Sequence, residues 1–430
     1  MGPDELRISY GRGHLSLTLP AAARPTIIRK TPLPKFADPA GAIASAFERP
    51  VGSASLAALA KGRRNACILI CDITRPVPNR LFLRPMIETL TASGVPLDEI
   101  SILVATGLHR PSLGGELAEL VGDPWVLEHV RVENHYARED ADHVDLGRTR
   151  TRGTPVKLDR RFVEAALRIA TGLVEPHFMA GWSGGRKVVA PGVAHHETIR
   201  TFHSARFMED PLAVQCNLVG NPLHEEQLEI VRMLGEVHAL NVVLDEDRDL
   251  VCTTFGEIVE SHQAAVDFVA GATMVHVARR FSTVVTSSAG YPLDKTYYQT
   301  IKGMVTPIDI LEPGGTLIIA SECSEGFGSA AFRQAQMRLL ELGPERFLAT
   351  LTAKSLAEVD EWQTEMQLKP MRVGRIELHT TGLVGEDRRL TGVEMIDDVA
   401  LAVERSIARS GDPHVAVIPE GPYVVPRCAP

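Results

Sequence analysis

Short apolar runs of strand length recur along the chain, each bounded by glycine, proline or polar residues. The predicted strands lie at residues 66–71, 100–105, 167–174, 242–244, 283–286, 315–320 and 415–418. Between several of them the apolar positions follow a helical period, at 79–92, 113–121, 225–234, 257–270 and 330–342. Strands that alternate with helices predict parallel sheets covered by helices, so we expect an α/β protein.

The chain is 430 residues long, which exceeds the size of one ordinary hydrophobic core. We expect two α/β domains with mainly parallel sheets, residues 1–275 and 276–430, and an active-site cleft between them. The division is placed after the helical run that ends near residue 270 and before the strand at 283. The first 50 residues carry no readable motif, and their pattern allows an edge hairpin.

Charge and composition narrow the class of protein. The 45 Lys and Arg residues are scattered and are outnumbered by 54 Asp and Glu residues, giving a net charge of −9. This balance argues against a nucleic-acid partner. The N-terminal stretch has no apolar signal core, and no apolar run approaches the ~18 residues needed to span a bilayer, so we expect a cytoplasmic protein with no membrane partner. The six cysteines form no CxxC pair and no zinc-ligand spacing.

Polar side chains follow the first two predicted strands. Asp72, Thr74 and Arg75 come after the first, and His109 follows the second. Ligands in open α/β sheets bind beyond the carboxyl ends of strands, where a hydroxyl and a guanidinium suit a phosphate or a carboxylate. The alternatives are a structural turn capped by Asp72 and a structural role for His109. A catalytic role for His109 is therefore supported only if other functional side chains accompany it.

The segment 172–192 has more potentially functional side chains per residue than any other part of the chain. His177 and Lys187 flank a turn made by Ser183, Gly184 and Gly185. The segment matches neither the P-loop nor the dinucleotide fingerprint, although a nucleotide could still bind. Apolar residues follow Lys187, and partial desolvation of its amine would lower its pKa and favour covalent attachment. The alternative is a solvated surface amine.

Two further motifs add a possible metal ligand and a substrate contact. His196 and His203 are seven residues apart, and HExxH is absent, so a metal held here must take its other ligands from elsewhere. Gln299 and Lys302 are three residues apart and would share a helix face, from which both could reach one substrate carboxylate or hydroxyl. Gln299 and Lys302 are explained equally well as ordinary polar residues of a helix.

Together these motifs resemble the nickel-dependent lactate racemase family, the 2-hydroxyacid racemases that use a nickel-pincer nucleotide. The matching stretches are 72–76, 106–111, 175–187, 203 and 298–302, with a looser match at 419–423. Several separate motifs in one order make chance similarity a poor explanation. The surroundings of Trp362 match a family tryptophan only weakly.

The resemblance implies a cofactor and its ligands. Lys187 would be acylated by the nickel-pincer nucleotide, a pyridinium-3,5-bisthiocarboxylic acid mononucleotide, and His203 would supply the one protein ligand to nickel. A carbon and two sulfurs of the cofactor would complete the square-planar coordination, which suits Ni(II). The other cofactor-binding residues would be Asp72, Thr74, Arg75, Ser183, Gly184 and Gly185. The first domain would hold all of these together with both catalytic histidines.

The activity implied by the resemblance is racemisation or 2-epimerisation of a small-molecule 2-hydroxy acid. His109 and His177 would be two opposed bases, and a proton-coupled hydride transfer would pass through a 2-keto acid. The substrate-binding residues would be Arg75, Tyr298, Gln299 and Lys302, the last three from the second domain. Accessory enzymes that build the cofactor would be partners.

Two alternatives belong to other classes. A catalytically inactive homologue could keep the fold as a nucleotide-binding or regulatory protein, although both bases, the lysine and the nickel histidine are present. An NAD-dependent dehydrogenase is disfavoured by the missing dinucleotide fingerprint. The motifs describe a shared reaction centre and do not identify the substrate tail.

Overall fold

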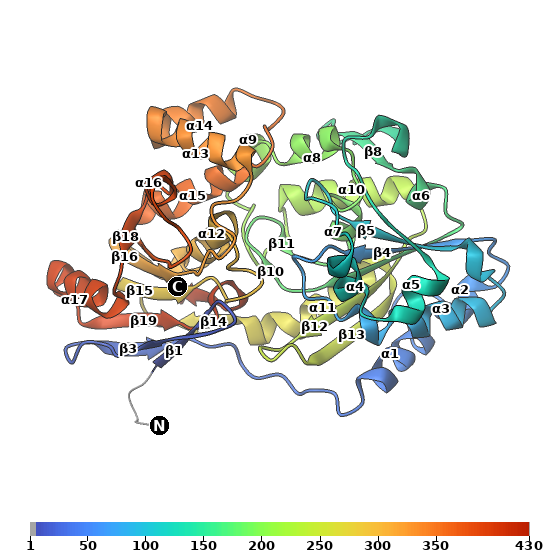
Figure 1. Ribbon diagram of the computed structural model, residues 1–430, viewed down its shortest axis with the longest axis horizontal. Helices are drawn as coiled ribbons and strands as arrows, with labels where there is room; N and C mark the ends of the chain where they lie inside the picture. The colour runs from blue at the N-terminus through green and yellow to red at the C-terminus, as the bar shows by residue number, and fades with distance from the viewer. Residues whose placement is uncertain (1–5, 430) are drawn as a thin grey trace. The chain divides into compact units, whose positions relative to one another are not determined.

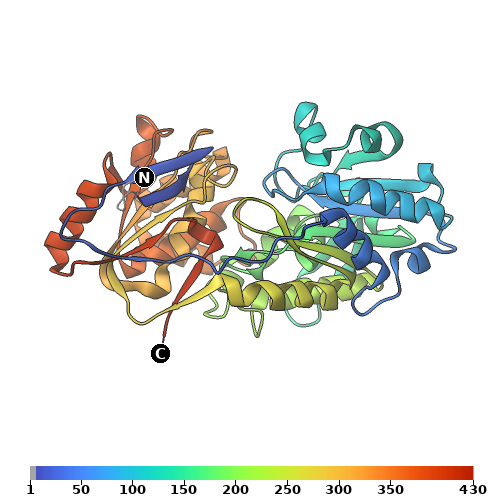
Figure 2. The same ribbon diagram turned by 90° about the horizontal axis from the view of Figure 1, so that it is seen from below.

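The computed structural model describes residues 6–429, which form two compact units (Figure 1). The N-terminal unit comprises residues 32–203 and 217–270. The C-terminal unit comprises residues 6–31, 204–216 and 271–429. Each unit is built on a six-stranded sheet with helices packed against it, as Figure 2 also shows.

The sheet of the N-terminal unit has the strand order β13-β12-β9-β4-β5-β6. All neighbouring strands are parallel except β13, which pairs antiparallel with β12 at one edge. The strands are β4 (Ala66–Cys71), β5 (Ile100–Ala105), β6 (Arg131–Asn134), β9 (Leu167–Leu173), β12 (His238–Leu244) and β13 (Leu250–Glu257). The carboxyl ends of β4, β5 and β9 therefore lie side by side at one edge of the sheet.

Burial explains why these strands read as continuous apolar runs. Residues 66–70 of β4 are all buried, because helices cover both faces of a parallel sheet. The helices of this unit are α1 (Pro39–Glu48), α2 (Leu56–Ala60), α3 (Leu83–Ala92), α4 (Gly115–Val121), α5 (Pro124–His129), α6 (Arg160–Val163), α7 (Arg186–Val189), α8 (His196–Phe202), α10 (Pro222–Leu234) and α11 (Ile258–Thr273). Asn221 caps α10 by accepting hydrogen bonds from the backbone N–H groups of Leu223 and His224.

The sheet of the C-terminal unit has the order β18-β17-β16-β15-β19-β3 and is parallel throughout. Its strands are β3 (Arg24–Ile27), β15 (Phe281–Ser287), β16 (Leu311–Ala320), β17 (Arg375–His379), β18 (Glu394–Ile396) and β19 (His414–Ile418). Its helices are α9 (Ala205–Met208), α12 (Tyr297–Val305), α13 (Ala330–Leu342), α14 (Pro344–Thr352), α15 (Glu361–Val373), α16 (Glu386–Leu390) and α17 (Val399–Ser410). The predicted α/β class with mainly parallel sheets is confirmed.

Four two-stranded ribbons complete the strand inventory of the described residues. They are β1 (Leu6–Tyr10) with β2 (Gly13–Leu17), β7 (His143–Arg148) with β8 (Pro155–Asp159), β10 (Pro176–His177) with β11 (Gly181–Trp182), and β14 (Met274–Val277) with β20 (Val425–Cys428). The first is the hairpin expected within the first 50 residues. The β10–β11 ribbon holds His177 at the end of its first strand.

The two units differ from the expected division at residue 275 in being discontinuous in sequence. Residues 6–31 join the C-terminal unit because β3 pairs in parallel with β19 at the edge of that sheet. Residues 204–216 join it because α9 packs on α15, where Lys369 donates to the Met208 carbonyl at 2.7 Å. Among residues 6–429 no helix is both long and apolar enough to cross a membrane.

Candidate functional site

The turn after β4 binds the histidine that follows β5. His109 Nδ1 lies 2.6 Å from Asp72 Oδ2, while Asp72 Oδ1 accepts hydrogen bonds from the Thr74 hydroxyl (2.6 Å) and the Thr74 backbone N–H (3.2 Å). Burial raises the pKa of Asp72, but the charge and hydrogen bond of His109 and the hydrogen bond of Thr74 outweigh it, so the pKa is lowered. Asp72 is therefore an ionised hydrogen-bond acceptor.

An ionised carboxylate fixes the tautomer of neutral His109. A carboxylate only accepts, so Nδ1 of His109 carries the proton and Nε2 has the lone pair. The expected role of Asp72 and Thr74 was contact with the cofactor. The structure gives both side chains partners within the protein, and it makes Asp72 the residue that orients a candidate base.

An ion pair connects the β4 turn to the end of β9. Arg75 Nη1 donates to Glu175 Oε1, and both side chains are largely buried. Sequence reasoning did not single out Glu175, and the available signal was an acidic residue directly after a buried strand. The ion pair orients the Arg75 guanidinium, whose fork has five N–H donors.

The Ser183-Gly184-Gly185 turn is held by its own unit. Ser183 Oγ donates to the Leu173 carbonyl at 2.6 Å and accepts from the Glu175 N–H at 3.0 Å. Gly184 and Gly185 have φ of +75° and +49°, a region that favours glycine. A Cβ on Gly184 would lie 2.8 Å from Val174 Cγ2, and one on Gly185 would lie 2.8 Å from the His262 side chain. Close packing and backbone conformation thus account for both glycines without a ligand.

His177 is buried, with 7 % of its surface exposed. Its Nδ1 accepts hydrogen bonds from the backbone N–H groups of Ala180 (3.2 Å) and Met179 (3.4 Å). A nitrogen that accepts an N–H cannot also carry a proton in that direction, so neutral His177 holds its proton on Nε2. The two candidate bases therefore show opposite tautomers.

One buried arginine and two neighbouring neutral histidines lie near the glycine turn. Arg186 is 1 % exposed, and its guanidinium donates to the Ala180 carbonyl at 2.8 Å and lies 3.0 Å from His262 Nε2. Burial lowers the pKa of Arg186 to about 9. Burial, together with the charge of Arg186, also lowers the pKa of His224 to about 3 and the pKa of His262 well below its ordinary value. Sequence reasoning passed over Arg186, although it precedes the expected tether.

Lys187 and His203 interact within the N-terminal unit. His203 follows the last residue of α8, is 7 % exposed, and donates from Nδ1 to the Ile199 carbonyl at 2.9 Å. Burial and the positive charge of Lys187 lower the pKa of His203 to about 3, despite the hydrogen bond to Ile199. The imidazole is therefore neutral, with its lone pair on Nε2. Lys187 itself is half-buried on the short helix α7.

The predicted substrate residues lie on α12 of the C-terminal unit. Tyr298 is tied to α15, because its hydroxyl lies 3.1 Å from Trp362 Nε1 and its carbonyl accepts from Gln363 Nε2 at 2.5 Å. Burial raises the pKa of Tyr298 well above its ordinary value. Gln299 and Lys302 follow on the same helix, and Gln299 Oε1 is buried without a hydrogen-bond partner among the described residues. Gln299 thus has an acceptor available for a ligand donor.

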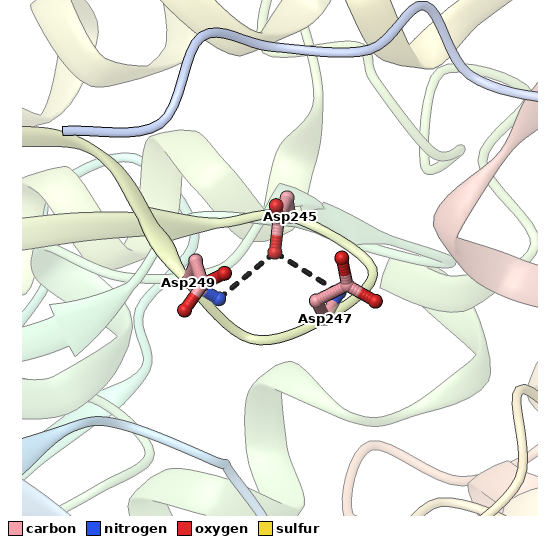
Figure 3. Close-up of side chains that lie close together, drawn as sticks. All are labelled: Asp245, Asp247 and Asp249. Carbon is pink, nitrogen blue, oxygen red and sulfur yellow. Dashed lines mark hydrogen bonds between the residues drawn. The ribbon is translucent and has the colours of Figure 1, made fainter. Parts of the chain in front are cut away.

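One group of three acidic side chains in the described part of the chain could hold a metal ion. Figure 3 shows Asp245, Asp247 and Asp249 around the turn between β12 and β13, with Asp245 accepting from the backbone N–H groups of the other two. Lys35 Nζ lies 2.7–3.0 Å from a carboxylate oxygen of each aspartate. Lys35 thus offsets one of the three negative charges and occupies the space between the carboxylates, and we assign no metal to this cluster.

Comparisons with known proteins identify the family of the chain. The Lactate racemase N-terminal domain model matches residues 10–215, and the Lactate racemase C-terminal domain model matches residues 277–425. A lactate racemase from Lactiplantibacillus plantarum is 32 % identical, over 89 % of this chain and 90 % of its own length. A lactate racemase from Thermoanaerobacterium thermosaccharolyticum is 29 % identical, over 98 % of this chain and 99 % of its own.

Solved structures give the same result for the fold. The lactate racemase apoprotein from Thermoanaerobacterium thermosaccharolyticum has a TM-score of 0.91 and 28 % identity, over 98 % of this chain and all of that one. A Thermotoga maritima protein at 16 % identity and a TM-score of 0.68, covering 87 % of this chain and 96 % of its own, shares the fold. The similarities define a two-domain α/β isomerase of the racemase type. The chain belongs to the lactate racemase family.

Proposed function

We propose that the protein racemises or 2-epimerises a 2-hydroxy acid with a nickel-pincer nucleotide bound covalently at Lys187. The observation that carries the proposal is the pairing of His203 with Lys187 in one unit. His203 is a buried neutral imidazole, and its pKa responds first to burial and also to the charge of Lys187. A metal ligand and a tether for the group that carries the metal need this proximity. The names of the relatives support lactate or a similar acid as the substrate.

The residues present fit a cofactor that brings most of its own metal ligands. His203 belongs to no group of three His, Cys, Asp or Glu side chains able to hold an ion among the described residues. The hydrogen bond from its Nδ1 to the Ile199 carbonyl leaves Nε2 unprotonated, which is how protein histidines usually bind metals. His203 would thus hold nickel through Nε2, and Lys187 would form the covalent bond.

The chemistry of racemisation requires more than a side-chain base, because the α-hydrogen of a 2-hydroxy acid is a poor acid. When bound, the cofactor supplies a hydride acceptor, so that the carbon centre passes through a planar 2-keto acid. The protein's own part is to bind the carboxylate, remove or return the hydroxyl proton, and exclude water.

The described side chains supply these functions. His109 takes the hydroxyl proton at Nε2, because Asp72 fixes the proton of the neutral ring at Nδ1. His177 meets the hydroxyl of the opposite enantiomer. Arg75, oriented by Glu175, and Lys302 bind the carboxylate, and the buried Gln299 Oε1 is an acceptor for a ligand donor other than the reacting hydroxyl. Tyr298 acts by fixing α12 to α15 through Trp362.

The cofactor assignment is tested by intact-protein mass and nickel content after production in cells that make the cofactor. Wild type and Lys61→Ala, a control at an exposed lysine, should carry the adduct and nickel. Lys187→Ala should lack the adduct. His203→Ala should keep the adduct and lose nickel, whereas His129→Ala, at an exposed histidine, should keep both. Full nickel in His203→Ala would overturn the ligand assignment.

The activity is tested by optical rotation with single enantiomers of lactate, longer aliphatic and aromatic hydroxy acids, malate and a sugar acid. Loaded protein should racemise or epimerise at least one of them. Adduct and nickel without turnover of any acid would favour an inactive homologue. Absence of the adduct from wild type would contradict the cofactor assignment itself.

A further inference from the structure

Arg186 is a buried cation that the proposed reaction does not use. Within residues 6–429 no carboxylate forms a hydrogen bond or an ion pair with it, and its Nε has no hydrogen-bond partner. A charge removed from water without a counterion is costly, so a protein rarely retains one without a structural or functional reason. What the guanidinium contacts should therefore indicate its role.

The contacts of Arg186 lead to His177 through one residue, Ala180. Arg186 Nη2 donates to the Ala180 carbonyl at 2.8 Å. The N–H of Ala180 donates to His177 Nδ1 at 3.2 Å. A hydrogen bond from an ionised donor is stronger than one between neutral groups, so the guanidinium holds the Ala180 carbonyl firmly in place. Arg186 thus acts on the residue whose N–H orients the His177 ring.

The same turn is fixed from a second direction. Arg186 Nη1 lies 3.0 Å from His262 Nε2 on α11, and His262 Nε2 lies 2.8 Å from the Ser183 carbonyl. A neutral Nε2 can accept from Arg186 or donate to the Ser183 carbonyl, but not both, so the guanidinium packs against His262 of α11 while it bonds the Ala180 carbonyl in the β10–β11 turn. Removing its donors would release the Ala180 carbonyl and let residues 179–180 move, and with them the two N–H groups that face His177.

We propose that Arg186 is a positioning residue that, by anchoring Ala180, holds His177 in the tautomer opposite to that of His109. His109 presents an unprotonated Nε2, whereas His177 presents Nε2–H. His109 is then ready to accept a proton, and His177 is ready to donate a hydrogen bond. For His177 to accept a proton at Nε2, the neutral ring must first move its own proton to Nδ1, which requires the Ala180 and Met179 N–H groups to turn away.

This inference rests on the proposed function for its catalytic meaning, but its structural part is measurable on the protein without cofactor. Full-length protein labelled with 15N in histidine would be studied by two-bond 1H–15N spectra of the imidazole rings at pH 8. His109→Gln and His177→Gln identify the two ring signals by their disappearance. Failure of the racemase proposal would show as missing turnover or nickel, and would leave these spectra unaffected.

The wild-type spectrum should show the proton on Nε2 of His177 and on Nδ1 of His109. Arg186→Met should abolish the single-tautomer preference of His177 and leave His109 unchanged. Arg186→Lys keeps a charged donor for the Ala180 carbonyl and should retain more of the preference than Arg186→Met. Arg131→Met, at an exposed arginine of the same unit, is the matched control and should change neither signal.

Two results would overturn the proposal. One is a proton on Nδ1 of His177 in the wild-type protein. The other is a folded Arg186→Met variant, judged by a cooperative thermal transition, in which His177 keeps the wild-type tautomer. If Arg186→Met does not fold, the wild-type spectrum decides the tautomer and Arg186→Lys decides the part played by the guanidinium fork.

Discussion

The two candidate bases lie in the same unit but in contrasting surroundings. The His109 side chain is 46 % exposed and is oriented by a buried carboxylate, whereas His177 is 7 % exposed and is oriented by backbone N–H groups beside a buried arginine. A carboxylate partner selects the Nδ1–H tautomer, and N–H donors select Nε2–H. A reaction that treats two mirror-image substrates alike can therefore depend on two histidines that the protein prepares differently.

The two histidines are also held in place by different parts of the fold. The Asp72–His109 pair joins the ends of neighbouring parallel strands, β4 and β5, so the sheet itself brings the two side chains together. His177 lies on a two-residue strand outside the main sheet, and its orientation depends on a loop and on Arg186. We expect changes around His177 to act through conformation and changes around His109 to act through charge.

The largest effect should come from removing either histidine. His109→Gln and His177→Gln should each lower turnover by about 10²- to 10⁴-fold, the usual contribution of a general acid–base group. Both should keep the Lys187 adduct and nickel. Initial rates from each single enantiomer measure the loss. A variant that retained wild-type rates in both directions would remove its histidine from the reaction.

A smaller effect should follow from removing the carboxylate that orients His109. Asp72→Asn replaces an acceptor by an amide that can turn its NH2 toward Nδ1 and select the wrong tautomer. Turnover should fall by about 10- to 100-fold, as for other residues that orient a catalytic side chain. Asp140→Asn is the matched control, because Asp140 pairs with His195 at 2.9 Å away from these groups. Equal losses in the two variants would show a general effect on folding.

The cationic surroundings of His177 predict a pH dependence of stability. Burial and nearby arginines lower the pKa of His224 to about 3, whereas in the unfolded chain it would lie near 6.5. Below about pH 6.5 the unfolded chain therefore binds a proton that the folded chain does not, so stability falls as the pH falls toward 3. This histidine contributes at most about 1.4 kcal/mol per pH unit to the unfolding free energy.

Denaturant unfolding between pH 7 and pH 5 measures this contribution. His224→Gln should reduce the slope of unfolding free energy against pH, while His129→Gln, at an exposed position, should leave it unchanged. An unchanged slope in His224→Gln would mean that this imidazole is hydrated in the folded protein. The surroundings of His224 and Arg186 would then contain more water than the structure indicates.

The smallest expected difference is between the two directions of the wild-type reaction. Enantiomers have equal free energies in water, so kcat/KM must be the same for both. If His177 rests as Nε2–H and must change tautomer to accept a proton, kcat and KM should each differ a few-fold between the enantiomers while their ratio stays fixed. Equal kcat values for a pair of enantiomers would show that the tautomer change costs nothing kinetically.

Sequence reasoning predicted the fold well because buried parallel strands leave continuous apolar runs. All seven predicted strands are present, and α13 has the predicted bounds. The discontinuous units could not be predicted, because nothing near residues 24–27 reveals that this strand pairs with residues 414–417. Such long-range pairing depends on the whole sheet and not on local pattern.

The sequence predicted candidate site residues, which stay a prediction, and it did not predict the contacts between them. The motif positions placed His109, His177, Lys187 and His203 in one unit, as found. The Asp72–His109 and Arg186–Ala180–His177 contacts were missed, because hydrogen bonds between loops leave no periodic signal in one sequence. That the glycines of the turn contact the cofactor stays a prediction, and the close packing of both against Val174 and His262 is a second reason for glycine there.

The most direct test of the proposed activity follows the hydrogen on the reacting carbon. A single enantiomer of a turned-over 2-hydroxy acid, deuterated at C2, would be incubated with loaded protein in ordinary water and analysed by chiral chromatography with mass detection. Hydride transfer within the site predicts an opposite enantiomer that keeps its deuterium. An opposite enantiomer carrying hydrogen from water would contradict the account, because it would show removal of the α-hydrogen as a proton.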